Sequence, residues 1–302
     1  MKQVTLFHNP AAGDEEHSKN ELVALMEKNG FECRYLSTKD KEWKDFDSDT
    51  DLLVIAGGDG TVRKVTKNLL DRKLNDTVPI ALLPLGTANN IAKTLGIAGK
   101  TSEIISSWVN ATIKKFDIGI VKNLPDAEFF LESFGYGIFP YLMSKMKKLE
   151  DGSDTPAESM KNALKQMHEI VVSYSPKYCE LEVDGTDHSG NFLLAEIMNT
   201  RSIGPNLVLS PLADAGDGEL EVILVPEKHT EKFAQYVLDE MNDVETTYQF
   251  HTLRGRDIHI SWEGTHVHVD DEILKLEKSA KAEIKIKSGL LEFLVPGNDK
   301  SE

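Results

Sequence analysis

One short run, Gly57-Gly58-Asp59-Gly60-Thr61, places a carboxylate among glycines and a hydroxyl group. An apolar run at 52–56 precedes it, and a helix-like segment at 61–70 follows. This order predicts a phosphate-binding turn, because glycines let backbone N–H groups approach a ligand and the first helical turn presents unpaired donors. Phosphates would repel Asp59 unless a cation lay between them, so the turn indicates a nucleotide bound with a divalent metal ion. The alternative is a tight turn without a ligand.

A second turn, residues 83–90, also lies between a strand-like run (80–83) and a helix-like run (91–95). In a parallel sheet both turns would lie at the carboxyl ends of their strands, where open α/β sheets bind ligands. Thr87 offers a hydroxyl group to such a ligand, and Asn89 and Asn90 offer amides. Alternatively, Thr87 or Asn89 only caps the following helix.

The first part of the chain alternates between strand and helix patterns, which predicts a mostly parallel sheet with helices on both faces. The predicted strands are 4–7, 31–36, 52–56 and 80–83, and the predicted helices include 15–28 and 101–109. From residue 115 on, strand-like runs follow one another, which predicts an antiparallel sheet or sandwich. These runs are 115–121, 129–133, 178–183, 191–199, 219–225, 257–261, 266–269 and 282–287, with helices at 157–171 and 229–241.

A turn-rich junction at 122–126 suggests a boundary between a first domain, 1–122, and a β-rich second domain, 123–289. We expect residues 150–156 to form a mobile loop and the tail, 297–302, to be disordered. His266 and His268 alternate along one predicted strand, and we interpret both as ordinary surface or cleft histidines.

The composition, with 40% hydrophobic and 28% charged residues among 302, is typical of a soluble protein. A net charge of −16 argues against nucleic acid as a partner. No apolar stretch approaches the roughly 20 residues of a membrane span, and the N-terminus lacks a signal peptide pattern, so we expect a cytoplasmic protein with at most peripheral membrane contact. The basic run 145–148 could make that contact, although a solvated helix face is the favoured interpretation. An exposed strand edge could pair two subunits as a homodimer.

In several ordered motifs the chain resembles the bacterial diacylglycerol kinase-like lipid kinases, relatives of sphingosine and ceramide kinases. Asn9-Pro10-Ala11-Ala12-Gly13 is similar to the family's NPxxG element, residues 57–61 match GGDGT, and residues 84–90 resemble PxGTxND. In the second half, Asn199, Gly204 and Pro211 resemble an N…G…P pattern, Asp217-Gly218 with Leu220 resembles DGxL, and Asp270-Asp271-Glu272 stands where the family has DGE. The resemblance runs from about residue 4 to about residue 296.

The resemblance implies an α/β nucleotide-binding domain, joined again by residues 290–302, and a mainly antiparallel β-sandwich substrate domain with inserted helices. It implies ATP and Mg²⁺ as cofactors and a hydroxyl group on a lipid or lipid-like molecule as acceptor. Its nucleotide-binding residues would be Asn9, Pro10, Gly13, Thr38, Gly57, Gly58, Asp59, Gly60, Thr61, Gly86, Thr87, Asn89 and Asn90.

Phosphoryl transfer needs positioning, charge neutralisation and a group that accepts the proton of the attacking hydroxyl. The resemblance implies Glu272 as this base, and Asp217 is the competing candidate; Asp59 would orient the metal. It also implies a metal site that would use Asp217 with main-chain oxygens near Asp214 and Glu219, whereas the bare Asp217-Gly218 pair could simply form a turn.

Three departures from the family pattern bear on activity: Asn90 and Gly216 replace usual aspartates, and Asp271 replaces a glycine where a left-handed conformation would be strained. They leave two alternatives to a lipid kinase. One is a nucleotide-binding, weakly active or inactive member with a regulatory or interaction role, and the other is a kinase for a soluble metabolite.

Overall fold

The computed structural model describes residues 2–13, 17–46, 49–73, 78–149, 155–245 and 249–297. The chain divides into two compact units, residues 1–117 with 288–302 and residues 118–287. It passes from the first unit to the second within β5 (Thr112–Lys122) and returns within β18 (Lys281–Val295), and these two strands pair with each other.

The first unit is built on parallel strands in the order β2-β1-β3-β4. These are β1 (Lys2–His8), β2 (Phe31–Ser37), β3 (Leu52–Gly57) and β4 (Ile80–Pro84). The end of β18 continues the sheet in parallel, since Phe293 pairs with Ile80 of β4. Every residue of β3 is buried, as expected for a central strand covered on both faces.

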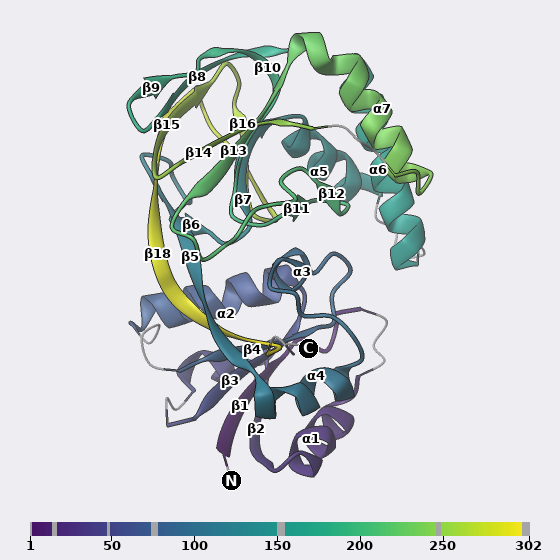
Figure 1. Ribbon diagram of the computed structural model, residues 1–302, viewed down its shortest axis with the longest axis vertical. Coiled ribbons are helices and arrows are strands. Elements are labelled where there is room, and N and C mark those ends of the chain that lie inside the picture. Colours follow the sequence, from purple (N-terminus) through teal and green to yellow (C-terminus); the bar gives the residue numbers. More distant parts are fainter. Residues whose placement is uncertain are drawn as a thin grey trace, which may run out of the picture. The chain divides into compact units, whose positions relative to one another are not determined.

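Helices cover this sheet on both faces, as the alternating sequence pattern predicts (Figure 1). They are α1 (Lys19–Lys28), α2 (Asp59–Asp71), the short α3 (Asn90–Thr94) and α4 (Thr101–Ser107), with 3₁₀ turns η1 (Glu42–Asp45) and η2 (Trp108–Asn110). The described part of α1 begins at Lys19, where the Ser18 and Glu21 side chains form a reciprocal capping box. Figure 1 shows α1 and α4 on one side of the parallel strands and α2 on the other.

The second unit is an antiparallel β structure in which β17-β16-β7-β10-β8-β15-β18 are successive neighbours and β13 joins β10 to β14. Its strands are β6 (Phe129–Phe130), β7 (Ser133–Gly137), β8 (Lys177–Val183), β9 (Thr186–Asp187), β10 (Gly190–Met198), β11 (Ser202–Ile203), β12 (Leu207–Val208), β13 (Leu220–Pro226), β14 (His251–Gly255), β15 (Asp257–Trp262), β16 (His266–Val269) and β17 (Glu272–Lys275). The fold class predicted from the sequence, a parallel α/β unit followed by an antiparallel β-sandwich, is confirmed.

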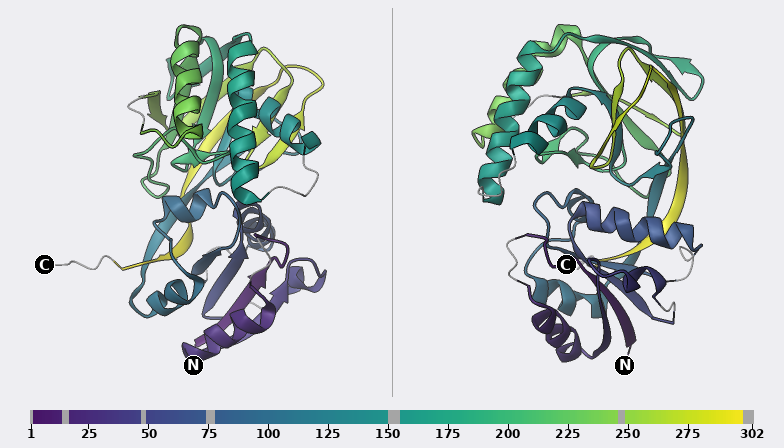
Figure 2. Two further views of the ribbon diagram at one scale, coloured as in Figure 1. Left: turned by 90° about the vertical axis from the view of Figure 1, so that its right-hand side faces the viewer. Right: turned by 180° about the vertical axis from the view of Figure 1, so that it is seen from behind.

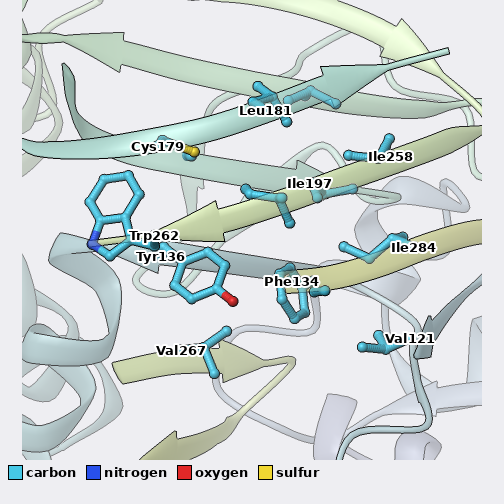
Figure 3. Close-up of a cluster of buried hydrophobic side chains, with 14 of the residues drawn as sticks. Val121, Phe134, Tyr136, Cys179, Leu181, Ile197, Ile258, Trp262, Val267 and Ile284 are labelled. Atoms are coloured by element: carbon cyan, nitrogen blue, oxygen red, sulfur yellow. The ribbon is translucent and has the colours of Figure 1, made fainter. Parts of the chain in front are cut away.

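Two apolar clusters hold the second unit together. One lies among the strands, where the Tyr136 and Trp262 rings stack with centroids 5.9 Å apart and Phe134 packs nearby (Figure 3). The other joins strand side chains such as Leu193 to the helices through Met167 and neighbouring residues. These helices, α5 (Ile138–Leu149), α6 (Pro156–Ser173) and α7 (Thr230–Met241, preceded by η3, Glu227–His229), lie together beside the strands in both views of Figure 2.

Some expectations about these elements need correction. The predicted strand 129–133 is interrupted, because β6 ends at Phe130 and β7 begins at Ser133. The basic run 145–148 forms the end of the longer helix α5, which the sequence did not predict as a whole, and Lys145 pairs with Glu169 of α6 at 2.9 Å. Most of the predicted mobile loop 150–156 and of the tail 297–302 lies outside the described residues. No helix in the described segments is long and apolar enough to cross a bilayer.

Candidate active site

The two glycine turns of the first unit touch each other. They follow the neighbouring strands β3 and β4, and the N–H of Leu85 donates to the carbonyl of Gly57 at 3.1 Å. A Cβ atom added at Gly58 would lie 3.1 Å from the Cα of Gly86, and one added at Gly86 would overlap Gly58. Only glycine at both positions allows two backbones to approach this closely, so the contact explains the two glycines before any ligand is considered.

Asp59 joins the two turns. As the first residue of α2, it accepts hydrogen bonds from the N–H of Asn90 (2.8 Å, Oδ2) and of Ile91 (3.0 Å, Oδ1) at the start of α3. Burial lowers the pKa of Lys93 on α3, and the Asp59 carboxylate opposes that shift. Asp59 is therefore a capping residue for α3, and its predicted role in orienting a metal ion stays a prediction.

Asn89 fixes the shape of the second turn. It adopts a left-handed conformation (φ 52°), which asparagine tolerates better than most residues. Its Nδ2 donates to the carbonyl of Gly86 at 2.5 Å, and its Oδ1 accepts from the N–H of Gly86 at 3.0 Å. Thr87 lies in this turn between Gly86 and Asn89, and it is exposed to solvent.

The Asn9–Gly13 element lies against the same turns. The N–H of Asn9 donates to the carbonyl of Ala56 at 2.9 Å, and its Nδ2 donates to the Thr61 hydroxyl at 3.3 Å. Gly13 has φ +66°, and a Cβ atom there would overlap the carbonyl oxygen of Leu85. The turn after β1, the glycine turn after β3 and the turn after β4 thus meet at one edge of the sheet.

Thr38, after β2, extends this edge. Its N–H donates to the carbonyl of His8 at 2.8 Å, and its carbonyl accepts from Nζ of Lys64 on α2 at 2.6 Å. Lys64 on α2 and Lys93 on the short α3 also belong to this edge, and no motif in the sequence marked either lysine. All the predicted nucleotide-binding residues belong to these turns, with Pro10 following Asn9 and with Gly60 exposed on the first turn of α2.

In the second unit, two of the residues named for the predicted metal site, Asp217 and Glu219, contact an arginine. Arg254 of β14 binds Asp217 through Nη2, Glu219 through Nη1 (3.1 Å) and Glu221 through Nε (3.3 Å). Asp214 instead accepts from the N–H of Gly216 at 3.1 Å. Within the described ranges, no group of three or more His, Cys, Asp or Glu side chains is arranged to hold a metal ion. A divalent cation at the same side-chain oxygens of Asp217 and Glu219 would lie against the guanidinium charge of Arg254. The site predicted from Asp217 and main-chain oxygens near Asp214 and Glu219 stays a prediction.

Glu272, the predicted base, is the exposed first residue of β17. It pairs with Val269 across the two-residue turn Asp270-Asp271. The left-handed residue of this turn is Asp270 (φ 51°) and not Asp271, so the strain expected at Asp271 does not arise. The Asp270 carboxylate accepts from the consecutive N–H groups of residues 131–133, at distances from 2.8 to 3.2 Å, which fixes the turn that carries Glu272.

A buried pair lies behind this turn. Nε2 of His268 is 2.9 Å from Oε2 of Glu196, Nδ1 of His268 is 3.0 Å from the carbonyl of Asp270, and both side chains are almost fully enclosed. Burial raises the pKa of Glu196; burial alone would lower the pKa of His268, but the carboxylate beside it produces a net rise. The interpretation of His268 as an ordinary surface or cleft histidine is therefore wrong, because its side chain is 1% exposed. Sequence reasoning missed Glu196, whose strand reads as an uninterrupted core segment.

Comparison with known protein families agrees with this architecture. Residues 3–121 match the diacylglycerol kinase catalytic domain, and residues 144–292 match the YegS C-terminal NAD kinase beta sandwich-like domain. A diacylglycerol kinase from Bacillus subtilis (strain 168) is 26% identical over 250 residues, covering 77% of each chain. A Staphylococcus aureus (strain MRSA252) protein with the provisional name of a lipid kinase is 26% identical over 260 residues, covering 84% of this chain and 81% of its own.

Solved structures show the same fold. The crystal structure of a diacylglycerol kinase from Bacillus anthracis str. Sterne superposes with a TM-score of 0.73 over 97% of both chains, at 21% sequence identity. The two family matches follow one another along the chain and together extend from residue 3 to residue 292. The chain is a lipid kinase-type phosphotransferase and belongs to the bacterial diacylglycerol kinase-like lipid kinase family.

Proposed function

We propose that this protein transfers the γ-phosphoryl group of ATP, bound with Mg²⁺, to a hydroxyl group on a diacylglycerol-like lipid. The observation that carries the proposal is the contact between the glycine turns after β3 and β4, joined by the Asp59 carboxylate. This arrangement brings the start of α2 and the backbone of two glycine turns to the edge of the sheet where open α/β folds bind phosphates.

In this proposal the first unit binds the nucleotide and the second unit binds the acceptor. Backbone N–H groups at the start of α2, with Thr61, Thr87 and Asn9 nearby, would hold and orient the phosphates. The lysines on α2 and α3 would add positive charge. Mg²⁺ would neutralise charge on the transferring phosphoryl group, which is what phosphoryl transfer chiefly requires from its surroundings.

Glu272 is the proposed general base, which would take the proton of the attacking hydroxyl group. Its exposed position at the start of β17, next to the turn that the Asp270 carboxylate holds, supports this choice. The fixed Asp270 turn would hold Glu272 in position. Asp217 remains the competing candidate and is tested alongside it.

The test is phosphate transfer from radiolabelled ATP, with Mg²⁺, to diacylglycerol, monoacylglycerol, ceramide, sphingosine, phosphatidylglycerol and a total lipid extract. We expect one lipid to be labelled, and we expect Asp59→Ala and Glu272→Gln to abolish or greatly reduce labelling. Asp71→Ala, on the exposed end of α2, and Glu277→Gln, exposed beyond β17, are matched controls that should keep it. Retained labelling in Glu272→Gln, together with loss in Asp217→Asn, would move the base to Asp217.

A second candidate, a nucleotide-binding member with weak or no turnover, is favoured by two observations: Asn90 replaces the usual aspartate, and Arg254 engages Asp217. ATP binding measured by calorimetry, with no lipid labelled, would support it. Labelling of a soluble compound in a cell extract would instead support a metabolite kinase. Flotation with neutral and anionic vesicles tests the expected peripheral membrane contact, and failure to float with either would count against it.

A further inference from the structure

Arg254 and the three carboxylates that it contacts, those of Asp217, Glu219 and Glu221, form a charged cluster, called here the Arg254 cluster. The carboxylates come from two places in the second unit. Glu221 on β13 stands directly opposite Arg254 on β14 in the antiparallel register, and Asp217 and Glu219 come from the loop that enters β13. Each carboxylate contacts a different nitrogen of the guanidinium group. The side chain of Glu221 is 6% exposed, so the cluster reaches from the surface into the sheet.

The loop is also closed by its own hydrogen bonds. The N–H of Asp217 donates to the carbonyl of Asp214 at 3.2 Å, and Oδ1 of Asp217 accepts from the N–H of Glu219 at 3.0 Å. The Asp214 side chain accepts from the N–H of Gly216 at 3.1 Å. Thus the Asp214 carbonyl and the Asp217 carboxylate, both predicted metal ligands, already have partners within the chain.

An arginine suits three converging carboxylates. Its guanidinium group carries five N–H donors in a rigid plane, accepts no hydrogen bonds and stays charged at all accessible pH values. A divalent ion at the same oxygens would need to approach within roughly 2.0–2.6 Å of them and would be repelled by the guanidinium charge. Arg254 and a divalent ion therefore cannot bind the same carboxylate oxygens at the same time, although either could neutralise their negative charge.

We propose that Arg254 is the built-in cation of this loop and takes the place of a divalent metal ion at Asp217 and Glu219. The structure of residues 211–219 then does not depend on any metal ion. The inference is independent of the proposed phosphoryl transfer, since it concerns how the loop is held together and not what reacts.

The test uses the full chain without nucleotide. Metal content is measured by mass spectrometry after dialysis, and thermal unfolding is followed in EDTA, in Mg²⁺ and in Ca²⁺. We expect the wild-type protein to retain no stoichiometric divalent ion and to keep the same melting temperature in all three. We expect Arg254→Met, which removes the charge but keeps the side-chain length, to lower the melting temperature in EDTA by roughly 4 °C or more. Calcium should restore part of that loss.

Arg256→Met is the matched control, because Arg256 lies two residues after Arg254 and its guanidinium group contacts Glu219 at the longer distance of 3.8 Å, while the hydrogen bonds of its backbone to Asp184 and Ile286 do not depend on the side chain. Its melting temperature should lie close to that of the wild type and should be the same in EDTA and in calcium. If Arg254→Met does not fold, Arg254→Lys takes its place, because lysine keeps one positive charge but lacks the planar guanidinium group. Its melting temperature should fall less in EDTA, and calcium should again restore part of the loss.

Three results would overturn the proposal. The first is a wild-type chain that carries about one divalent ion and loses thermal stability in EDTA. The second is an Arg254→Met variant that melts like the Arg256→Met control. The third is a destabilised Arg254→Met variant that calcium does not restore, because its carboxylates would then not act as metal ligands at all.

Discussion

At the scale of single residues, the candidate site depends on how closely two backbones approach. Gly58 and Gly86 come from different turns, and neither turn could carry a side chain at its point of contact without displacing the other. The glycines of GGDGT are therefore needed for packing as well as for binding a ligand. The sequence indicates the ligand-binding role, but only the structure shows that Gly58 must be a glycine because it packs against Gly86.

We expect Gly86→Ala to lower the free energy of unfolding by about 1–3 kcal/mol, because the new Cβ atom would overlap the Gly58 backbone, which cannot move away as a flexible side chain would. ATP binding should weaken at the same time, since the turns would separate. Chemical denaturation and calorimetry measure the two effects. Gly58→Ala provides the comparison: its Cβ atom would lie 3.1 Å from Gly86, so its effect should be smaller. An equal or larger effect for Gly58→Ala would contradict this account.

At the scale of elements, the segment between β6 and β7 explains why one predicted strand became two. The Asp270 carboxylate binds the N–H groups of residues 131–133, and Nδ2 of Asn199 donates to the carbonyl of Leu131 at 3.0 Å. Side chains thus take over main-chain groups that a continuous strand would have paired with its neighbours. The apolar content of this segment correctly predicted burial, but it contained no information about these distant partners.

Asp270→Asn should lower the free energy of unfolding by roughly 2–3 kcal/mol, because an amide keeps one acceptor oxygen and turns an NH₂ group toward buried N–H donors. Asparagine tolerates the left-handed backbone, so the change isolates the side-chain effect. Denaturant titration measures it. The exposed neighbour in the same turn offers the control, and Asp271→Asn should change stability by less than about 0.5 kcal/mol. Similar losses for the two variants would exclude a special role for the Asp270 carboxylate.

At the scale of the whole molecule, the buried Glu196–His268 pair links folding to pH. Burial raises the pKa of Glu196, and the Glu196 carboxylate raises that of His268 above its usual 6.5, so the folded chain holds protons more tightly than the unfolded chain. The stability that His268 contributes is complete below pH 6.5 and is lost as the pH rises through its higher folded pKa. The Glu196 contribution is likewise complete below its usual pKa of 4.5 and is lost at higher pH.

We therefore expect the stability advantage of the wild type over Glu196→Gln/His268→Gln to shrink as the pH rises above 6.5, by at most about 1.4 kcal/mol per pH unit for each proton released. Denaturant unfolding at a series of pH values measures this difference. His266→Gln, on the same strand but only partly buried, should follow the wild-type profile. An advantage that stays constant or grows with pH would show that the pair does not hold its protons more tightly when folded.

The sequence by itself determined the fold class and the glycine turns of the candidate nucleotide site. Both follow from local patterns: the period of apolar residues, the glycines, and the position of a turn between a strand and a helix. The placement of those turns at one sheet edge also followed, because parallel strands share the direction of their carboxyl ends.

Only the tertiary structure decided which side chains neutralise one another. Arg254 meets Asp217 from 37 positions away, His268 meets Glu196 from 72, and Asp270 meets Leu131 from 139. No local period records such pairings, because charge and hydrogen-bonding capacity are satisfied by whichever group the folded backbone brings near. The sequence therefore shows that Asp217 can bind a cation, but only the folded structure shows that the cation beside Asp217 is the guanidinium group of Arg254.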